Sequence, residues 1–337
     1  MNKLLSFCIP SYNMENYLAN CLDSLLSASN DVEVLIIDDG SKDKTLSIAK
    51  DYEKKYPNLF KAIHEENRGH GGAINNALSL AKGEYFKVLD ADDWCDKEAL
   101  HKLLDFLRKG NRPDLILMNY TYWQDGKTIT KIIHFNGYLE TNKVVPISSV
   151  KRFKITDYIT LHSAFYKTSI LRECGVILPE HCFYEDNYFV YAPLPYVKTI
   201  SYIPSSLYQY RVGRAGQSVA IENMIKHWSD LVKCGYLVFD AVDIMPYKKS
   251  NPHLYHLLKH QLSLNIMYVP MYPQFTPTKE AREAIKAFWK HCKSTNPKQA
   301  RMVHRIPKVN VMSYPGAFGR FSAKFWFNLA HKVVKFN

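Results

Sequence analysis

The sequence predicts an α/β fold, with a doubly wound, mainly parallel central sheet followed by a C-terminal helical region. Short apolar runs of β-forming residues alternate with amphipathic segments over residues 3–120, an order typical of parallel sheets with crossover helices. Beyond about residue 220, apolar residues recur at helical spacing. We therefore expect a first domain over residues 1–215 and a helical, basic region over residues 216–337.

Each predicted element is bounded by residues that favour its type. The expected strands, each ended by turn or polar residues, are 3–10, 32–38, 59–64, 84–90 and 114–120. The expected helices between them are 16–26, 41–56, 73–81 and 97–108. Residues 121–215 combine short strands with many aromatic residues. Further helices are expected over 223–245, 253–269 and 278–292, the last two separated by Pro270, Pro273 and Pro277.

Composition and cysteine spacing favour an ordinary globular protein with reduced thiols. The 337 residues are 47% hydrophobic, and no apolar run approaches the roughly 20 residues that a membrane-spanning helix needs. Seven cysteines, an odd number without a C-x-x-C pair, argue against a disulfide framework or a zinc site. No basic and apolar segment typical of a signal peptide opens the sequence. We therefore expect a cytoplasmic protein.

The net charge of +12 is concentrated near the C-terminal end. After Glu283 the sequence holds no Asp or Glu, and its last 54 residues contain eleven Lys or Arg. This leaves about +1 for residues 1–283, so the body is nearly neutral and the final segment is a cation. Because the charge is segregated and no known binding module accompanies it, nucleic acid is a disfavoured partner.

Residues 321–336 predict a basic amphipathic helix. Its apolar arc contains Phe321, Phe325, Trp326, Leu329, Val333 and Phe336. Its polar arc contains Lys324, Asn328, His331, Lys332 and Lys335. Such a helix, with Trp and Phe opposite lysines, is typical of peripheral contact with the inner face of the cytoplasmic membrane. The alternative is that the apolar arc docks on the protein itself.

Two acidic clusters follow predicted strands, Asp38-Asp39-Gly40-Ser41 and Asp90-Ala91-Asp92-Asp93. Either cluster alone would be explained by helix capping and turn formation. Because the carboxyl ends of parallel strands share one edge of a sheet, the two clusters together favour a ligand site there. A divalent cation that bridges a diphosphate would account for the density of the second cluster, and the first could hydrogen-bond a base or ribose.

Several segments, in order, resemble the family 2 inverting glycosyltransferases of GT-A fold, of the non-processive bacterial type. The segments are SFCIPSYN, VEVLIIDDGSKDKT, ENRGHGGAINNAL, GEYFKVLDADDW, FYEDNYF and LYQYRVG, between residues 3 and 215. A processive synthase would have membrane spans and a Q-x-x-R-W motif, whereas QYRVG has no Trp. The resemblance implies a Rossmann-like GT-A domain, a UDP-sugar donor and Mn²⁺ or Mg²⁺ as cofactor.

The resemblance also implies residues that bind the nucleotide. Pro10, Tyr12 and Asp39 match positions that contact it, with Asp39 at the carboxylate that recognises the uracil edge. Asn67 and Gly69 belong to a loop, residues 67–75, that closes over the nucleotide before a helix begins.

The D-x-D pair and a later acidic pair match the family's metal ligand and general base. Asp90 is expected on the ribose side and Asp92 as the direct metal ligand. Asp93 could contact sugar hydroxyls or cap the next helix. Asp186 matches the base that takes the proton of the acceptor hydroxyl, and Glu185 is a candidate acceptor contact. Without the other motifs, the acidic pair would be interpreted as surface charge.

Three further residues have a functional and a structural interpretation. Arg211 matches a diphosphate contact on a flexible loop, although a structural arginine on a strand fits equally well. Trp94 could form the floor of the acceptor site or lie in the interior. His162 lies in a segment that borders the acceptor site in the family.

The leading hypothesis is therefore a metal-dependent inverting hexosyl- or N-acetylhexosaminyltransferase. Its acceptor would be a hydroxyl of a saccharide or lipid-linked glycan in the synthesis of a cell-surface polysaccharide or glycoconjugate. A phosphatase of the haloacid dehalogenase type is an alternative because VLDADD imitates its D-x-D strand end, although Asp93-Trp94 stands where that family has Thr or Val. A basic nucleic-acid-binding protein is the alternative from a different class.

Overall fold

The computed structural model describes residues 3–28, 30–213, 217, 220–276 and 278–334. The chain forms two compact units. The first contains residues 1–151, 159–182 and 196–212, and the second contains residues 152–158, 183–195 and 213–337. The chain therefore passes between the units several times, and the segment that contains Asp186 belongs to the second.

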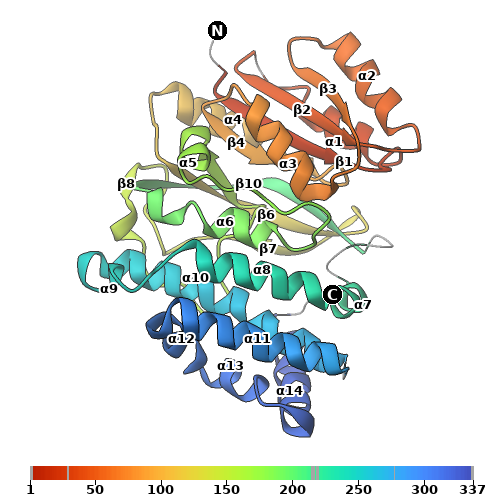
Figure 1. Ribbon diagram of the computed structural model, residues 1–337. Coiled ribbons are helices and arrows are strands. Elements are labelled where there is room, and N and C mark those ends of the chain that lie inside the picture. The colour runs from red at the N-terminus through yellow and green to blue at the C-terminus, as the bar shows by residue number, and fades with distance from the viewer. Residues whose placement is uncertain (1–2, 29, 214–216, 218–219, 277, 335–337) are drawn as a thin grey trace. The chain divides into compact units, whose positions relative to one another are not determined.

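The first unit is built on a ten-stranded, mainly parallel sheet, which confirms the predicted α/β class (Figure 1). Eight strands follow the order β3-β2-β1-β4-β9-β6-β10-β5, with β7 paired to β6 and β8 to β10. The strands are β1 (Leu5–Ser11), β2 (Val32–Asp39), β3 (Phe60–Glu65), β4 (Tyr85–Val88), β5 (Trp94–Cys95), β6 (Leu115–Gln124), β7 (Thr128–Ile133), β8 (Val145–Pro146), β9 (Ala164–Lys167) and β10 (Thr199–Val212). The order agrees with the predicted β-α alternation.

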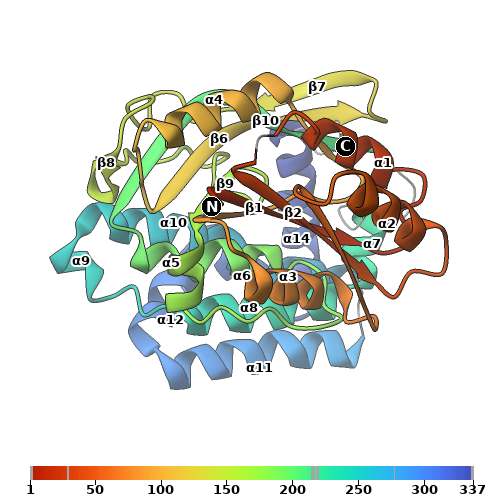
Figure 2. The same cartoon turned by 90° about the horizontal axis from the view of Figure 1, so that it is seen from above.

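Helices cover both faces of this sheet. They are α1 (Leu18–Leu25), α2 (Thr45–Lys55), α3 (Gly69–Leu80), α4 (Lys97–Arg108) and α5 (Thr168–Glu173). β1 is buried along its whole length, as expected for a central strand with helices on both sides. Leu5, Phe7 and Ile9 pack with the apolar faces of α1 and α4. Figure 2 shows α4 and α3 on opposite sides of the sheet.

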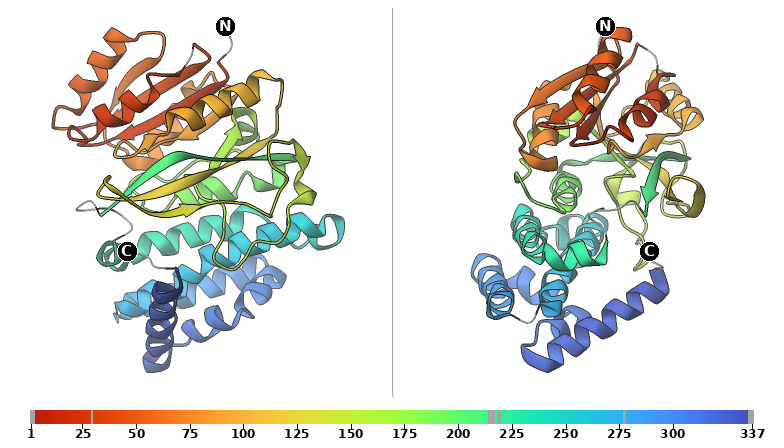
Figure 3. Two further views of the ribbon diagram at one scale, coloured as in Figure 1. Left: turned by 180° about the vertical axis from the view of Figure 1, so that it is seen from behind. Right: turned by 90° about the vertical axis from the view of Figure 1, so that its right-hand side faces the viewer.

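Two features of the sheet differ from the sequence-based expectation. β9 is antiparallel to both neighbours, β4 and β6, and separates them. β10 is a long strand of 14 residues that runs parallel to β6, as the left view of Figure 3 shows, where short strands were expected. The pairing shifts register between Ile203 and Ser206 and again before Tyr208. Pro204 lies inside this irregular stretch and has no N–H for the ladder, which explains the interruption.

The second unit is helical in its described residues. Its helices are α6 (Asp186–Tyr191), α7 (Ile221–Lys226), α8 (Trp228–Ala241), α9 (Tyr247–Ser250), α10 (Pro252–Met271), α11 (Lys279–Thr295), α12 (Pro297–His304), α13 (Pro307–Met312) and α14 (Gly316–Val334). A short 3-10 turn in this unit is η3 (Tyr272–Phe275). Of the other two, η1 (Ile147–Ser149) belongs to the first unit, and η2 (Leu194–Tyr196) lies where the chain returns to the first unit. Pro270 lies within the last turn of α10, so the helix ends one residue beyond it. Pro277 lies outside the described residues.

All seven cysteines are free thiols, as the sequence predicts. Among the described residues, we find no helix with both the length and the apolar character that crossing a bilayer would require.

Candidate active site

Asp39, at the end of β2, holds the first turn of α3. Its Oδ1 accepts a hydrogen bond from the backbone N–H of Arg68 at 2.6 Å, and its Oδ2 accepts one from Gly69 at 2.9 Å. Burial raises the pKa of this carboxyl, and the two backbone donors oppose that rise. α3 therefore begins at Gly69 and not at Ala73, so most of the predicted nucleotide loop is the first part of a helix. Each oxygen keeps a second lone pair that could accept from a base.

Asn67 and Gly69 fix the approach to this helix. The side-chain amide of Asn67 donates to the carbonyl of Asp39 at 2.9 Å. Gly69 has φ +76°, and a Cβ there would lie 2.9 Å from the backbone nitrogen of His181. Glycine is therefore required at this position both by its backbone conformation and by the close approach of another segment.

The variant Gly69→Ala is expected to be clearly less stable than Gly110→Ala. Gly110 also has a positive φ, +85°, but its Cβ would meet nothing within 4 Å, so alanine there should cost only the conformational term of about 1–2 kcal/mol. At position 69 the contact with His181 adds to that term. Urea unfolding of both variants measures the difference, and equal loss of stability would show that the close approach does not matter.

Pro10 and Tyr12 lie where β1 ends. Pro10 is buried and paired in register with Ile37 of β2, whereas Tyr12 lies just beyond the strand with 43% of its surface exposed. An exposed aromatic ring beside a sheet edge is available for stacking on a base.

Asp90 follows β4 and is held ionised by its neighbours. His70 Nε2 lies 3.0 Å from its Oδ1, and the hydroxyl of Tyr208 lies 3.2 Å from its Oδ2. Burial alone would raise the pKa of Asp90, but the hydrogen bond and charge of His70, with help from His162 and Tyr208, lower it to about 2. The side chain therefore offers a carboxylate at neutral pH.

Asp93 is fully buried next to Asp90. Its Oδ2 accepts from the hydroxyl of Tyr208 at 2.6 Å, and its Oδ1 accepts from the backbone N–H of Arg211 at 2.7 Å. Burial raises the pKa of Asp93 well above its ordinary value, and the charges of Asp92 and Asp90 add to the effect. Asp93 does not cap the next helix, because Asp96 does so by accepting from Ala99 at 2.8 Å. That alternative was wrong.

His162 meets these carboxylates within a group of tyrosine rings. Its ring centroid lies 4.3 Å from that of Tyr210 and 4.7 Å from that of Tyr208. Burial lowers the pKa of His162 to about 4, so the ring is neutral at pH 7. Its Nδ1 is buried and accepts or donates no hydrogen bond within the described residues. A neutral imidazole with an unused nitrogen is suited to metal ligation.

Asp90, Asp93 and His162 together could hold a cation. One ligand atom from each lies within 4.8 Å of the other two, the one such group of three among the described residues. Two carboxylates and one imidazole suit a divalent ion such as Mn²⁺. Asp92, the predicted direct ligand, is also nearly buried, and its backbone carbonyl accepts from Arg211 Nε at 3.0 Å.

Lys87 supports this group from inside the sheet. Its ammonium is fully buried and donates to the carbonyls of Leu161, His162 and Ala164 at 2.5, 2.7 and 3.4 Å. It also lies 5.0 Å from the centre of the Tyr208 ring. Burial lowers the pKa of Lys87 to about 7, against smaller contributions from nearby acids. Lys87 thereby fixes the backbone that presents His162.

Arg211 and Trp94 form a second layer beside the acids. Arg211 is on strand β10 and not on a loop, and its guanidinium lies 5.2 Å from the ring centre of Trp94 and 5.3 Å from that of Tyr17. Trp94 is half-buried on β5 and packs against Trp123 at 5.5 Å. Arg211 is therefore a strand residue with structural contacts, as one of its two interpretations expected. Its role in binding the diphosphate stays a prediction.

Glu185 and Asp186 open helix α6 in the second unit. Asp186 is the first residue of the helix and is half-buried, whereas Glu185 has 3% of its surface exposed. Tyr184, directly before them, has φ +69°, an unfavourable backbone conformation for a bulky residue. Such strain is common at functional positions and is maintained only when the surrounding packing enforces it.

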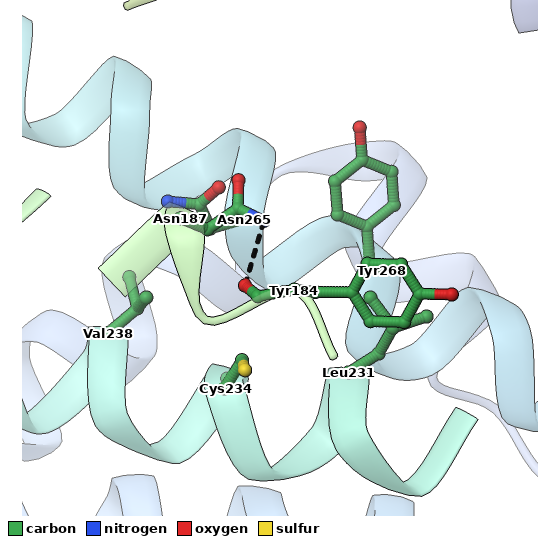
Figure 4. Close-up of a pocket in the computed structure, with 8 residues that line it drawn as sticks. Tyr184, Asn187, Leu231, Cys234, Val238, Asn265 and Tyr268 are labelled. Carbon is green, nitrogen blue, oxygen red and sulfur yellow. Dashed lines mark hydrogen bonds between the residues drawn. The ribbon is translucent and has the colours of Figure 1, made fainter. Parts of the chain in front are cut away.

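A small pocket adjoins this segment within the second unit (Figure 4). It is lined by Tyr184, Asn187, Leu231, Cys234, Gly235, Val238, Asn265 and Tyr268. Its volume of about 10 Å³ is room for one water molecule, so the pocket does not accommodate a sugar.

A comparison with models of protein families gives a match that covers half of the chain. Residues 6–175, half of the chain, match the model of "Glycosyl transferase family 2". The chain belongs to glycosyltransferase family 2. The matched region contains the whole of the Asp90, Asp93 and His162 group and the Asp39 contact with α3.

Relatives of this family 2 glycosyltransferase are found among proteins of Bacillus. The protein EpsH of Bacillus subtilis (strain 168) is 30% identical over 216 residues, which are 62% of this chain and 60% of EpsH. The poly(ribitol-phosphate) beta-glucosyltransferase of Bacillus spizizenii is 32% identical over 222 residues, which are 64% of this chain and 33% of that protein. The chain thus spans less than two thirds of the length of either relative.

Solved structures confirm the GT-A fold. The crystal structure of S. aureus TarS residues 1–349 in complex with UDP-GlcNAc superimposes with a TM-score of 0.68. The likeness covers 98% of this chain and 91% of that one, at 21% identity. The C-terminal helical region is therefore part of the shared architecture as well as the sheet.

Sequence reasoning about this family 2 glycosyltransferase missed His70, Tyr208 and Lys87. His70 lies in the RGHGG segment, which was interpreted through its glycines alone. Tyr208 follows the irregular stretch of β10, where Pro204 was the available signal. Lys87 was a visible anomaly, because a lysine interrupts the apolar run YFKVL of a central strand.

Proposed function

We propose that this chain is a metal-dependent, inverting glycosyltransferase that moves a sugar from a UDP-sugar to a hydroxyl of a saccharide or lipid-linked glycan. The observation that supports it most is the grouping of Asp90, Asp93 and the neutral His162 at the carboxyl end of β4, inside the region that matches the family. Ligands of open parallel sheets bind at this edge. A phosphatase or a nucleic-acid-binding protein has no comparable support.

Asp90, Asp93 and His162 fit a divalent cation, with Asp92 as a further candidate ligand. The fit is supported by the buried Nδ1 of His162, which has no hydrogen-bond partner among the described residues. A cation held there would neutralise the negative charge of the departing diphosphate. Tyr208 and His70 orient the two carboxylates through the hydrogen bonds described above.

Asp186 is proposed as the general base. In an inverting transfer, the acceptor hydroxyl attacks the anomeric carbon on the side opposite the leaving group, and one carboxylate must take its proton. Asp186, at the first position of α6 and half-buried, is held next to the strained Tyr184. Asp39 and Tyr12 are proposed to bind the uracil, and Asn67, Gly69 and Pro10 to shape the nucleotide site.

The relatives suggest the classes of donor and acceptor. One solved structure with the same fold is a complex with UDP-GlcNAc, and one relative is named as a poly(ribitol-phosphate) beta-glucosyltransferase. We therefore propose a UDP-hexose or UDP-N-acetylhexosamine as donor. The acceptor would be a polymer or lipid-linked precursor of the cell surface.

Donor hydrolysis and thermal stabilisation by a panel of UDP- and GDP-sugars, with Mn²⁺ or Mg²⁺, test this function. We expect stabilisation by one or more UDP-sugars that depends on the metal and is lost with EDTA. A protein stabilised equally by GDP-sugars, or unaffected by every nucleotide sugar, would contradict the proposal.

The variants Asp93→Asn and His162→Gln are expected to weaken Mn²⁺ binding at least tenfold, because loss even of groups behind a metal's ligands commonly costs that much. Free Mn²⁺ measured by electron paramagnetic resonance in the presence of UDP gives the affinity without relying on turnover. Asp92→Asn serves as the comparison. A loss confined to Asp92→Asn would assign the metal to Asp92 and not to the group of three.

We further propose that α14 brings the protein to the inner membrane surface. Ala323 is buried in an apolar cluster that includes Met271 and Tyr272, and the partly buried Trp326 packs against this cluster, so the helix docks by one face and Trp326 is not on its exposed face. A separate stripe stays open, with Phe318, Phe321, Phe325 and Leu329 exposed by 57, 70, 53 and 39%. Lys324 lies exposed beside it. Aromatic and basic residues in this arrangement suit an interfacial helix. Of the predicted arc, the side chain of Val333 and the whole of Phe336 lie outside the described residues.

The double variant Phe321→Ser/Phe325→Ser is expected to reduce binding to phosphatidylglycerol vesicles at least tenfold, since inserting each phenylalanine contributes about 1.5–3 kcal/mol. Co-sedimentation with vesicles measures this. Ile177→Ser removes a side chain of the first unit that is 74% exposed and should leave binding unchanged. Equal effects of both changes would refute the role of α14.

A further inference from the structure

A basic groove lies in the second unit between α11 and α12, which adjoin in the chain (Figure 1). It is lined by Lys293, Pro297, Ala300, Arg301, His304 and Arg305 and has a volume of about 410 Å³. Lys293, Arg301 and Arg305 are exposed at its surface. We call these three residues the groove cations.

The packing of α12 fixes where its arginines lie. Asn296 begins the helix by accepting from the N–H of Gln299 at 3.0 Å. The buried side chain of Gln299 then donates to the carbonyl of Phe239 at 3.0 Å and accepts from the N–H of Ile244 at 2.9 Å. Because Gln299, Ala300 and Val303 face the interior, Arg301 must lie on the open side. Arg305 follows one turn later on the same side.

The groove cations have no acidic partner in the part of the chain that the structure describes. The sequence has no Asp or Glu after Glu283, and Asp240, which reaches α11, is engaged by His291 at 2.7 Å. Burial and the nearby charge of Lys293 lower the pKa of His304, which disfavours a positive charge on its ring. Its Nδ1 lies 3.0 Å from the side-chain amide of Asn310, and its ring centroid lies 4.8 Å from that of Trp289. These contacts fix the His304 ring as part of the lining of the groove.

We propose that this groove binds phosphodiester groups of an anionic polymer, and that this polymer is the acceptor. The second half of this statement rests on the proposed glycosyl transfer. Guanidinium groups donate two parallel hydrogen bonds to phosphate, which makes arginine the preferred side chain for such recognition. Arg301 and Arg305 are four residues apart, so their Cβ atoms are about 6 Å apart along one helix face. A row of cations suits a linear chain of phosphates better than a single compact anion.

The groove is distinct from the proposed membrane contact. Among the described residues of α11 and α12, no large apolar side chain is exposed, whereas the stripe of α14 has four. An interfacial site would place apolar side chains beside its cations so that they enter the acyl region. The groove has the cations alone, which favours a water-soluble phosphodiester chain over a lipid headgroup.

The test compares two double variants of the full chain that each remove two charges. Arg301→Gln/Arg305→Gln changes the groove, and Lys286→Gln/Lys290→Gln changes exposed lysines of α11 outside it. Binding of a synthetic glycerol-phosphate oligomer is measured by titration calorimetry at low salt. A neutral oligosaccharide, a single-stranded oligonucleotide and phosphatidylglycerol vesicles are the comparison ligands.

We expect the groove variant to weaken oligomer binding at least tenfold, because hydrogen bonds between a guanidinium and a phosphate are among the strongest that side chains make. The lysine variant should change it less than twofold. Equal losses in the two variants, equally tight binding of the oligonucleotide, or an effect confined to the vesicles would each overturn the proposal. Metal-dependent hydrolysis of the UDP-sugar should persist in the groove variant, and its absence from the wild-type protein would refute the proposed function without affecting this measurement.

Discussion

Replacing Asp186 with Asn is expected to lower kcat for sugar transfer by about 10²–10⁴-fold, the usual contribution of a general base. Asn has nearly the same shape but cannot take a proton, so the acceptor hydroxyl would have to attack without losing it. The half-buried Asp186 can still be replaced without a cavity or a clash, because only one oxygen becomes an amide. Initial rates with saturating donor and acceptor measure the effect.

Donor binding separates this role from a structural one. UDP-sugar affinity in the presence of metal should stay within about twofold of wild type, since Asp186 is not assigned to the nucleotide or the cation. Asp243→Asn, which changes an exposed acid of the same unit that caps a turn at Met245, is the matched control and should retain full activity. If Asp186→Asn kept wild-type kcat, the base would have to be sought elsewhere.

Replacing Lys87 with Met is expected to destabilise the protein by about 2–4 kcal/mol. The change leaves the carbonyls of Leu161, His162 and Ala164 without their donor, at about 1–3 kcal/mol for each, and the loss is partly offset because the variant no longer buries an ammonium. Met fills a similar volume, so packing loss is a minor part of the effect. Urea unfolding with constant m-value measures the change in the free energy of unfolding.

The pH dependence of that difference has a defined sign. Because burial lowers the pKa of Lys87 to about 7 in the folded state, the unfolded chain binds more protons between about pH 7 and pH 10. The contribution of Lys87 to stability therefore rises with pH across this window, and the gap between wild type and Lys87→Met should widen. Lys87→Arg also removes the titrating amine, because guanidinium does not lose its proton in this window, so its gap from wild type should widen with pH as the gap for Lys87→Met does. A constant gap for Lys87→Met would show that Lys87 stays fully charged.

Sequence patterns predicted those helices and strands that are determined by residues close together in the chain. The strand around Phe7 and the helix with Leu100, Leu103 and Leu107 were recognisable because their apolar residues follow the strand and helix periods. The start of α3 was misplaced by four residues because its cap, the carboxylate of Asp39, comes from another strand. β9 was not foreseen, since four residues whose pairing is antiparallel in a parallel sheet give no distinctive pattern.

The sequence predicted the acidic residues of the candidate site but not the residues that hydrogen-bond to them. Asp39 and Asp90 stand in recognisable motifs directly after strands, so their place at the sheet edge followed from topology. The pairing of Asp93 with Tyr208 joins positions 115 residues apart, and its location depends on the register of β10. Contacts between residues so far apart in the chain produce no recognisable pattern in the sequence. They decide which carboxylate is ionised and which is buried.

During synthesis, β4 and β6 leave the ribosome well before the strand that joins them. Since β9 separates these two strands, the sheet stays in two parts, with open edges, until residues 164–167 have been made. β10 adds a further delay of more than 30 residues, and open edges favour aggregation in nascent chains. Pairing of distant segments also slows folding. The first unit therefore gains its native sheet only after residue 212 emerges, and the hydrogen bonds of Tyr208 to Asp90 and Asp93 can form only at that late stage.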